Sequence, residues 1–341
     1  MDPRLIGYIE SSPMGFGGWA IGGPFTAGGQ PAGWGEVDDQ ESIAAIRAAF
    51  DAGITLFDTA NVYGTGHSER ILAQALEGHR NQVVLATKWG NTMQEDTRIL
   101  DGSDGSATAM RRSLEGSLRR LDTDYIDLFQ FHLNDFDGPG VWELQEALEE
   151  VAAQGKIRAY GWSTDFPDRA HQWIGGRHFW AIQAEINVLN DNPGIFELAE
   201  DNELACLNRG PLAMGLLSGK YTSSTLVGPD DVRGANPEWL RYFHNGRPSP
   251  EFLSMLDSVR AALTCDGRSL VQGALAWLWG RSRTAIPIPG IRTVAQAEEN
   301  AAAMEFGPLP PAAMEEIENL LRSDGDETFE LRASRGSQPP G

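Results

Sequence analysis

The chain has 341 residues, of which 41% are hydrophobic, and this is enough to bury a core for one large α/β barrel or two smaller domains. Its 48 acidic and 27 basic residues give a formal net charge of −21, which argues against nonspecific binding to nucleic acid or to an anionic membrane. Two cysteines cannot build a disulfide framework, and no signal peptide or apolar run of about 20 residues is evident, so we expect a cytoplasmic protein.

Short apolar runs alternate with helix-like stretches along most of the chain. In chain order, the runs expected as strands and the helices that follow them are 14–21 with 38–53, 54–58 with 68–78, 82–88 with 106–122, 125–132 with 141–155, 156–163 with 166–173, 179–186 with 193–201, 203–208 with 268–280, and 284–288 with 294–304. The strand runs are nearly continuously apolar, which is typical of parallel strands covered on both faces. Eight such units without a linker favour a closed (β/α)8 TIM barrel over a doubly wound sheet.

Two regions depart from this spacing. Residues 209–265, after the seventh strand, are rich in Gly, Pro, Asn and Trp, and we expect them to form a functional lid. Residues 323–341 are polar, and we expect a partly disordered tail. The sequence therefore predicts a single barrel domain over 1–322.

Four polar residues, Asp58, Tyr63, Lys88 and His132, lie at or just past the ends of the second, third and fourth apolar runs. Side chains at strand ends converge on one mouth of a barrel. Each residue alone could be ordinary: a cap, a packing residue, a loop cation or a core histidine. Their joint appearance favours a shared site.

These four residue types suit proton transfer to or from an oxygen. A phenol has an ordinary pKa of about 10, and a buried ammonium beside it lowers that pKa. Asp58 can supply the counterion that a buried Lys88 needs, and His132 can orient a carbonyl by hydrogen bonding. The set suits protonation of a carbonyl oxygen or removal of a proton from an alcohol. No GxGxxG, P-loop or HExxH motif occurs, and we expect no metal site.

Several motifs together resemble one known family. FDTANVYGTGHSE, ATKWG, DLFQFH, GWST, GPLAMGLLSGK and PGIRTVAQAEEN cover about residues 5–305 and are similar to the aldo-keto reductase superfamily of bacterial type. The resemblance implies a barrel that binds a nicotinamide cofactor, usually NADP(H), without a Rossmann fingerprint. It also implies that Tyr63 is the acid/base, that Lys88 and Asp58 tune it, and that His132 positions the carbonyl.

The resemblance further implies the cofactor contacts. Gln183 would hold the nicotinamide carboxamide with Ser163, whereas Thr164 stands where the family commonly has Asn, and Arg209 stands where an aromatic residue usually stacks. Arg292 at the start of the last helix suits a 2′-phosphate and favours NADP over NAD. The remaining implied contacts are Gly18, Trp19 and Asp58; Gly210, Pro211, Leu212, Gly215, Ser218 and Lys220 along the pyrophosphate; Arg233 at the adenosine; and Gly290, Gln296, Glu299 and Asn300.

Substrate residues are expected in the loops that follow the strands. They are Trp19, Trp89, His132 and Asn134, with Trp34, Tyr221 and Trp239 from longer loops. An aromatic rim suits sugars and hydrophobic ketones equally. The sequence therefore predicts a monomeric or weakly oligomeric NADP(H)-dependent reductase of a small carbonyl compound. The alternatives are a redox-sensing or auxiliary subunit with little turnover, and a hydrolase or lyase with Asp58 and Glu185 as paired carboxylates.

Overall fold

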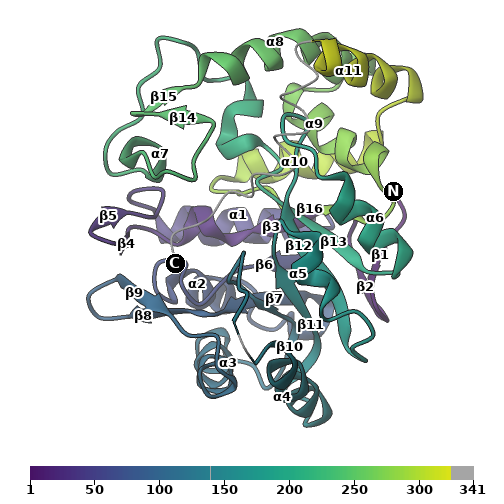
Figure 1. The fold of residues 1–341 in the computed structure, drawn as a ribbon. Coiled ribbons are helices and arrows are strands. Elements are labelled where there is room, and N and C mark those ends of the chain that lie inside the picture. The colour runs from purple at the N-terminus through teal and green to yellow at the C-terminus, as the bar shows by residue number, and fades with distance from the viewer. Residues whose placement is uncertain (139, 324–341) are drawn as a thin grey trace.

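Eight parallel strands form the centre of the computed structural model, which describes residues 1–138 and 140–323 (Figure 1). Around the barrel they are β3 (Gly15–Gly17), β6 (Leu56–Asp58), β7 (Val84–Trp89), β10 (Ile126–Phe131), β11 (Ile157–Ser163), β12 (Phe179–Glu185), β13 (Ala205–Arg209) and β16 (Ala285–Pro287). Gly17 N donates to Pro289 O at 2.8 Å and Gly17 bridges Gly290, so the last segment joins the first strand. The predicted (β/α)8 barrel is confirmed.

Helices surround the strands, and several of them begin at a residue whose side chain caps the helix. They are α1 (Asp39–Asp51), α2 (His67–Ala75), α3 (Ala107–Leu121), α4 (Val141–Ala153), α5 (Pro167–His171), α6 (Pro193–Asp201), α7 (Val232–Ala235), α8 (Pro250–Leu263), α9 (Leu270–Arg281), α10 (Val294–Phe306) and α11 (Pro311–Ser323), with 3-10 turns η1 (Gly18–Ile21), η2 (Arg80–Gln82), η3 (Ala213–Ser218) and η4 (Cys265–Gly267). Asp38 accepts hydrogen bonds from Gln40 N and Glu41 N at the start of α1, as its position in the sequence predicts. No described helix is long and apolar enough to span a membrane.

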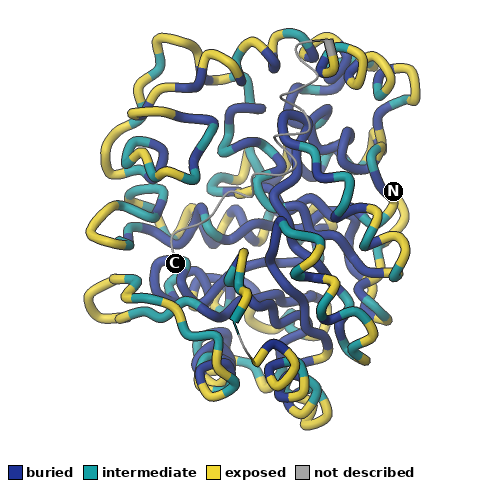
Figure 2. The backbone as a smooth tube through the Cα atoms, in the orientation of Figure 1, coloured by how far each residue is buried: buried dark blue, intermediate teal, exposed yellow. Residues whose placement is uncertain are grey.

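Alternation along the strands divides the core into two parts. Successive side chains of a strand point to opposite faces. Leu56, Val84 and Leu128 belong to the cluster inside the barrel, whereas their neighbours Phe57 and Leu85 pack outside it, against the helices. Figure 2 shows the strands as the buried centre and the loop tips as the exposed parts. Inward positions nearer the carboxyl ends of the strands therefore reach the mouth.

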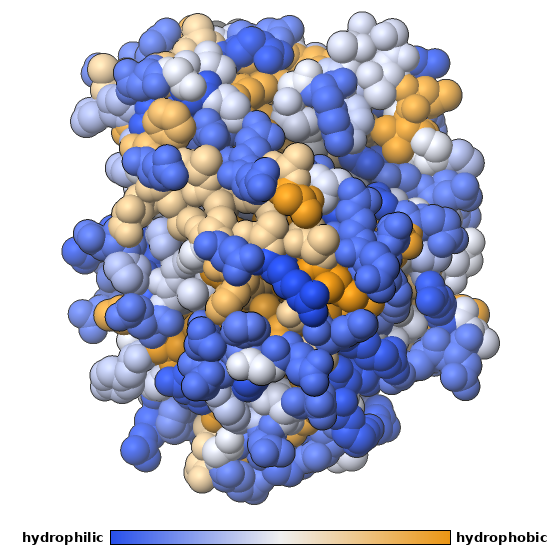
Figure 3. All heavy atoms as spheres, turned by 180° about the vertical axis from the view of Figure 1, so that it is seen from behind, coloured by the Kyte–Doolittle hydropathy of each residue, from blue (hydrophilic) through white to orange (hydrophobic). Residues whose placement is uncertain are grey.

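The two ends of the barrel are closed differently. The hairpin β1 (Arg4–Ile6) and β2 (Ile9–Ser11) covers the amino end, on the right in Figure 1, and places Ile6 and Ile9 in the inner cluster. The carboxyl end, on the left, carries a small sheet of β5 (Gln30–Pro31), β4 (Thr26–Ala27), β9 (Ile99–Ser103) and β8 (Asn91–Gln94). Neither addition was predicted. Seen from behind, the surface is largely hydrophilic, with a band of hydrophobic residues across its middle (Figure 3).

The segment 209–265 is more regular than the sequence suggested. It contains η3, α7, the hairpin β14 (Phe243–His244) and β15 (Arg247–Pro248), and the 14-residue helix α8. Val232 N donates to Gly33 O at 2.8 Å and Trp34 bridges Asp231, so this segment joins the loop after β3 across the mouth. The predicted tail lies outside the described residues except for Ser323, the last residue of α11.

Candidate active site

The carboxyl end of the barrel brings the four predicted polar residues together. Lys88 Nζ donates to Asp58 Oδ2 at 2.6 Å, to Thr59 O at 2.9 Å and to the Tyr63 hydroxyl at 3.1 Å. The His132 and Tyr63 rings meet edge to face, with centroids 6.1 Å apart. Asp58 and Lys88 occupy inward positions of β6 and β7, because they follow Leu56 and Ala86 of the inner cluster by two residues.

Burial dominates the pKa of Tyr63. Burial raises this pKa, while the charge of Lys88 lowers it by a smaller amount, and the net direction is upward. The expectation of a lowered phenol pKa is therefore wrong for the sum of these effects, because it counted the ammonium but not the loss of water around the ring. The phenol remains protonated near neutral pH.

At neutral pH Lys88 is charged and His132 is neutral. Burial alone would lower the pKa of Lys88, but Asp58 and Tyr63 raise it above its ordinary value, so Lys88 stays an ammonium. Burial and the charge of Lys88 lower the pKa of His132 well below its ordinary value. A neutral imidazole has one N–H donor. The Nδ1 atom of His132 is buried and has no hydrogen-bond partner.

Asp58 is also held by two amides. Gln130 Nε2 and Gln183 Nε2 donate to Asp58 Oδ1 at 3.1 and 2.9 Å. The Oε1 atom of Gln183 is buried without a partner, and so is Asn208 Oδ1. A buried, unpaired carbonyl oxygen suits a ligand that brings an N–H donor, such as a carboxamide. Gln183 therefore fits the position that the resemblance implies for the nicotinamide.

Two supporting residues were not predicted from the sequence. Gln130 could have been found from its inward position, two residues before His132. Glu69 is fully buried and accepts hydrogen bonds from Thr87 at 2.7 Å and from Arg120 Nε at 2.6 Å. It thereby links the start of α2 to the strand that carries Lys88. Glu69 is the last residue of the motif FDTANVYGTGHSE, and the motif alone does not show that its side chain makes these contacts.

Residues at the ends of β10 and β11 bind one another. Thr164 Oγ1 donates to Asn134 O, and Asp165 N donates to Asn134 Oδ1 at 2.8 Å. Ser163 is buried at the end of β11. Thr164 and Asn134 thus connect two neighbouring loops of the mouth.

Arg209 pairs with two carboxylates from neighbouring strand ends. Its Nη2 binds Asp165 Oδ2, and its Nη1 lies 3.4 Å from Glu185 Oε2. Its positive charge opposes the rise in the pKa of Tyr63 and helps to lower the pKa of His132, so it acts on the same end of the mouth. Arg209 is oriented by these acids.

Two further predicted basic residues bind protein groups. Arg233 pairs with Asp231 and donates to Met214 O at 3.2 Å, and its guanidinium lies 4.6 Å from the centre of a Trp34 ring. Arg292 donates to the carbonyl oxygens of Trp34 and Glu36 at 3.2 and 2.6 Å. Both guanidinium groups therefore hold the loop after β3.

The other predicted cofactor residues lie around this loop and at the start of α10. Gly18 is in η1, where an added Cβ would lie 2.8 Å from Asp58 O. Gln296 Oε1 accepts from Arg292 N at 2.8 Å. Gly210, Pro211, Leu212, Gly215, Ser218 and Lys220 lie in or next to η3, and Gly290, Glu299 and Asn300 lie before or within α10.

One indole stacks on the phenol, and two more pack against that indole. The Trp19 ring stacks on Tyr63 with centroids 6.0 Å apart, and it contacts Trp34 at 5.3 Å and Trp239 at 6.2 Å. Trp89 is different: it is fully buried and stacks on Phe131 at 4.7 Å. The expected substrate contact of Trp89 is wrong, because strand alternation points this residue outward next to the inward Lys88.

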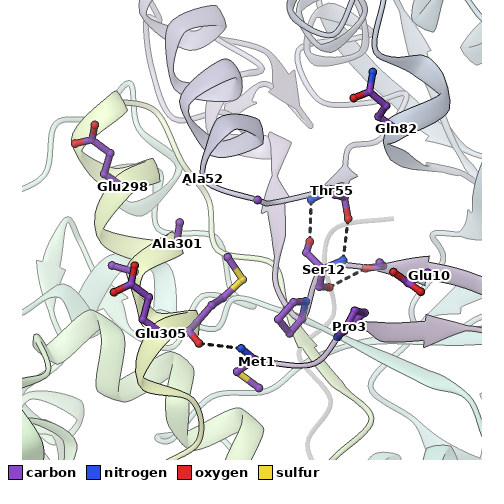
Figure 4. A pocket seen from close by; sticks show the side chains of 15 residues that line it. Met1, Pro3, Glu10, Ser12, Ala52, Thr55, Gln82, Glu298, Ala301 and Glu305 are labelled. Atoms are coloured by element: carbon purple, nitrogen blue, oxygen red, sulfur yellow. Dashed lines mark hydrogen bonds between the residues drawn. The ribbon is translucent and has the colours of Figure 1, made fainter.

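A groove at the amino end of the barrel lacks such chemistry (Figure 4). It encloses about 740 Å³ and is lined by Glu10, Glu298 and Glu305 among others. The polar contacts that Figure 4 draws there, such as Ser12 N to Thr55 Oγ1 at 2.8 Å, join protein groups to one another. Among the described residues, no three His, Cys, Asp or Glu side chains are arranged to hold a metal ion.

Comparisons with known proteins agree with the fold. The family model "Aldo/keto reductase family" matches residues 13–322. "Aldo-keto reductase YhdN" of Bacillus subtilis is 34% identical over 298 residues, with 85% of this chain and 84% of that protein covered. L-glyceraldehyde 3-phosphate reductase of Escherichia coli strain K12 is 32% identical over 295 residues, covering 80% and 81%.

Solved structures are similar over nearly the whole chain. Glycerol dehydrogenase AKR11B4 from Gluconobacter oxydans has a TM-score of 0.79 and 30% identity, with 94% of this chain and 95% of that chain covered. The holo form of aldo-keto reductase AKR11C1 from Bacillus halodurans has a TM-score of 0.74 and 27% identity, covering 94% and 96%. The chain therefore belongs to the aldo/keto reductase family.

Proposed function

We propose that this protein is an NADP(H)-dependent oxidoreductase that interconverts a small carbonyl compound, such as an aldehyde, ketone or keto-sugar, with its alcohol. The observation that carries the proposal is the buried chain of contacts from Asp58 through Lys88 to the hydroxyl of Tyr63. When bound, the nicotinamide supplies or takes up the hydride. Tyr63 is the general acid or base at the oxygen.

Each residue has a distinct part in this reaction. The protonated Tyr63 donates its proton to the carbonyl oxygen as the hydride reaches the carbonyl carbon, and the resulting phenolate is stabilised by the ammonium 3.1 Å away. Asp58 keeps that ammonium charged. The neutral His132 donates a hydrogen bond that orients the carbonyl oxygen beside the phenol. The indole of Trp19, with Trp34 and Trp239 packed against it, covers one face of the phenol.

The cofactor preference rests on a small number of residues. The free Oε1 of Gln183 suits the nicotinamide carboxamide, with Ser163 as its partner. Arg292, next to the start of α10, suits a 2′-phosphate once it leaves the carbonyls of Trp34 and Glu36. Relatives carry names of both kinds: an aldo-keto reductase of Schizosaccharomyces pombe is named with NADP(+), and a methylglyoxal reductase of E. coli is named NADH-specific.

Tyr63→Phe tests the role of the phenol. We expect the variant to keep its NADPH affinity and to lose at least about 100-fold in kcat, because general acid catalysis contributes roughly 10²–10⁴-fold. The assay follows NADPH consumption with a panel of aldehydes, ketones and sugars. Tyr160→Phe is the matched control, since the Tyr160 hydroxyl donates to Glu149 outside the barrel, and its kcat should not change.

The alternatives give different results in the same assay. A redox-sensing subunit would bind NADPH tightly and turn over no member of the panel. A hydrolase with Asp58 and Glu185 as paired carboxylates would not respond to NADPH at all. This last alternative is not favoured, because the two carboxylates are held in separate ion pairs with Lys88 and Arg209.

A further inference from the structure

Three buried polar side chains inside the barrel form a closed set of hydrogen bonds. Gln130 Nε2 donates to Asp58 Oδ1 at 3.1 Å, and Gln183 Nε2 donates to the same oxygen at 2.9 Å. Gln183 Nε2 also donates to Gln130 Oε1 at 3.0 Å. At most 2% of each residue is exposed. Buried polar groups depend on such contacts, because they are removed from bulk water.

A glycine between the two amides lets them meet across β11. Gln130 of β10 pairs in register with Gly161 on β11. Gly161 is an inward position, because its neighbours Tyr160 and Trp162 pack outside the barrel. Gln183 lies on β12, on the other side of β11. Since no side chain at position 161 separates the two amides, the amide of β10 reaches that of β12.

The carboxylate of Asp58 decides which way each amide points. Asp58 is paired with the ammonium of Lys88, and an ionised carboxylate only accepts hydrogen bonds, so both amides present their NH2 groups to it. The second hydrogen of the Gln183 NH2 group is accepted by Gln130 Oε1. If the Gln183 amide turned over, its oxygen would face two other oxygens and both hydrogen bonds would be lost. Gln183 Oε1 is therefore the free end of the amide, and this buried atom has no partner.

We propose that Gln130 is a positioning residue, which holds the amide of Gln183 so that its carbonyl oxygen is presented to the cofactor. This inference rests on the proposed function, in which Gln183 Oε1 accepts an N–H of the nicotinamide carboxamide. Gln130 acts through Gln183 and needs no contact with the cofactor. Without Gln130 Oε1, one N–H of Gln183 is left buried and unpaired, so the amide loses one of the two contacts that orient it.

The test compares the binding of NADP⁺ with that of its acetylpyridine analogue, in which a methyl ketone replaces the carboxamide. The analogue offers Gln183 no N–H, and the two molecules carry the same charge. The ratio of the analogue Kd to the NADP⁺ Kd therefore reports the contact of Gln183 Oε1, whereas a change in the charge around Asp58 alters both Kd values alike. Both Kd values are measured by quenching of tryptophan fluorescence.

The expected ratios differ between the variants. Wild-type protein should bind NADP⁺ about tenfold more tightly than the analogue, as expected for one hydrogen bond to a buried acceptor. In Gln130→Met, a substitution of similar volume, this ratio should fall to about threefold, because the acceptor is present but less well oriented. Gln183→Met removes the acceptor and should abolish the preference. The double variant should match Gln183→Met, since Gln130 then has no amide to orient.

Gln145→Met is the matched control. It makes the same substitution on α4, outside the barrel, where Gln145 Nε2 donates to Trp173 O at 2.8 Å. Its ratio should equal that of the wild type. Gln130→Leu also lacks the amide oxygen, so it replaces Gln130→Met in the test if thermal melting shows that variant to be unfolded.

The outcomes separate this inference from the proposed function. An unchanged ratio in Gln130→Met, including a rise of both Kd values by the same factor, overturns the positioning role and leaves the proposed function standing. A wild-type protein that binds NADP⁺ and the analogue equally well also overturns the inference, because Gln183 then accepts nothing from the carboxamide. Absence of any binding of NADP⁺ and NADPH to the wild-type protein overturns the proposed function, and the inference with it.

Discussion

Replacing Lys88 with Met removes the charge at the centre of the site. The ammonium makes three contacts, to Asp58, Thr59 O and Tyr63, and the side chain is fully buried. Removing one partner of a buried ion pair costs about 3–5 kcal/mol, because the other charge is left uncompensated. Two amides still donate to Asp58, so we expect a loss of about 3 kcal/mol, together with a decrease in kcat of roughly 100-fold or more.

A double-mutant cycle with Asp58→Asn isolates the interaction. The free energy of unfolding is measured by urea titration with tryptophan fluorescence, and turnover by NADPH consumption. The double variant should recover most of the lost stability, because no charge remains buried, but none of the lost activity. Lys156→Met, which breaks an exposed pair with Glu115, is the control and should cost at most about 1 kcal/mol. A double variant no more stable than Lys88→Met would refute the electrostatic reasoning.

Three other predictions test the mouth. Arg292→Ala should raise the Kd of NADPH at least about tenfold and change that of NADH little, since one charge-assisted contact to the 2′-phosphate is lost; equal losses in a fluorescence titration would contradict this role. Gly64→Ala should destabilise the protein by well over the roughly 1–2 kcal/mol that a positive φ costs, because the new Cβ would lie 1.7 Å from Gly22 O. Gly78→Ala is the control, since Gly78 also has a positive φ but its added Cβ would meet no atom within 4 Å. Similar urea midpoints for the two variants would reject the steric argument. The pKa of His132 is lowered in the folded state, so as the pH drops the unfolded chain binds this proton before the folded protein does. The free energy of unfolding therefore falls as the pH drops below about 6.5. In urea titrations from pH 8 to 5 this free energy should fall less in His132→Asn than in the wild type, and an equal dependence on pH would disprove the assignment.

The sequence predicted the barrel because the apolar runs of its strands are nearly uninterrupted. It did not predict the helices α8 and α11. Both have the helical spacing of buried residues, as with Ala313, Ile317 and Leu321 in α11. Their spacing would have been enough to predict them, but they were overlooked because they lie outside the repeating strand and helix units. The small sheet at the mouth was missed because its strands are short and contain exposed polar residues.

The candidate site divides in the same way. Position at a strand end was enough to bring Asp58, Lys88 and His132 to one mouth, but it could not separate Lys88 from Trp89. The alternation of side chains along β7 separates them, but only once it is known which residues of the strand point into the barrel. The pKa of Tyr63 required the burial of its ring, which depends on Trp19 from another loop. The sequence is enough to identify Lys88 as a charge that acts on the pKa of Tyr63. The loss of water around the Tyr63 ring follows only from the three-dimensional packing.

Burial of Tyr63 favours carbonyl reduction over alcohol oxidation on the proposed mechanism. A raised pKa keeps Tyr63 protonated, so it is ready to donate but would be slow to accept a proton from an alcohol. When the proton leaves, Lys88 stabilises the phenolate of Tyr63. This limits how far burial raises the pKa of Tyr63, and so limits the cost of the proton transfer.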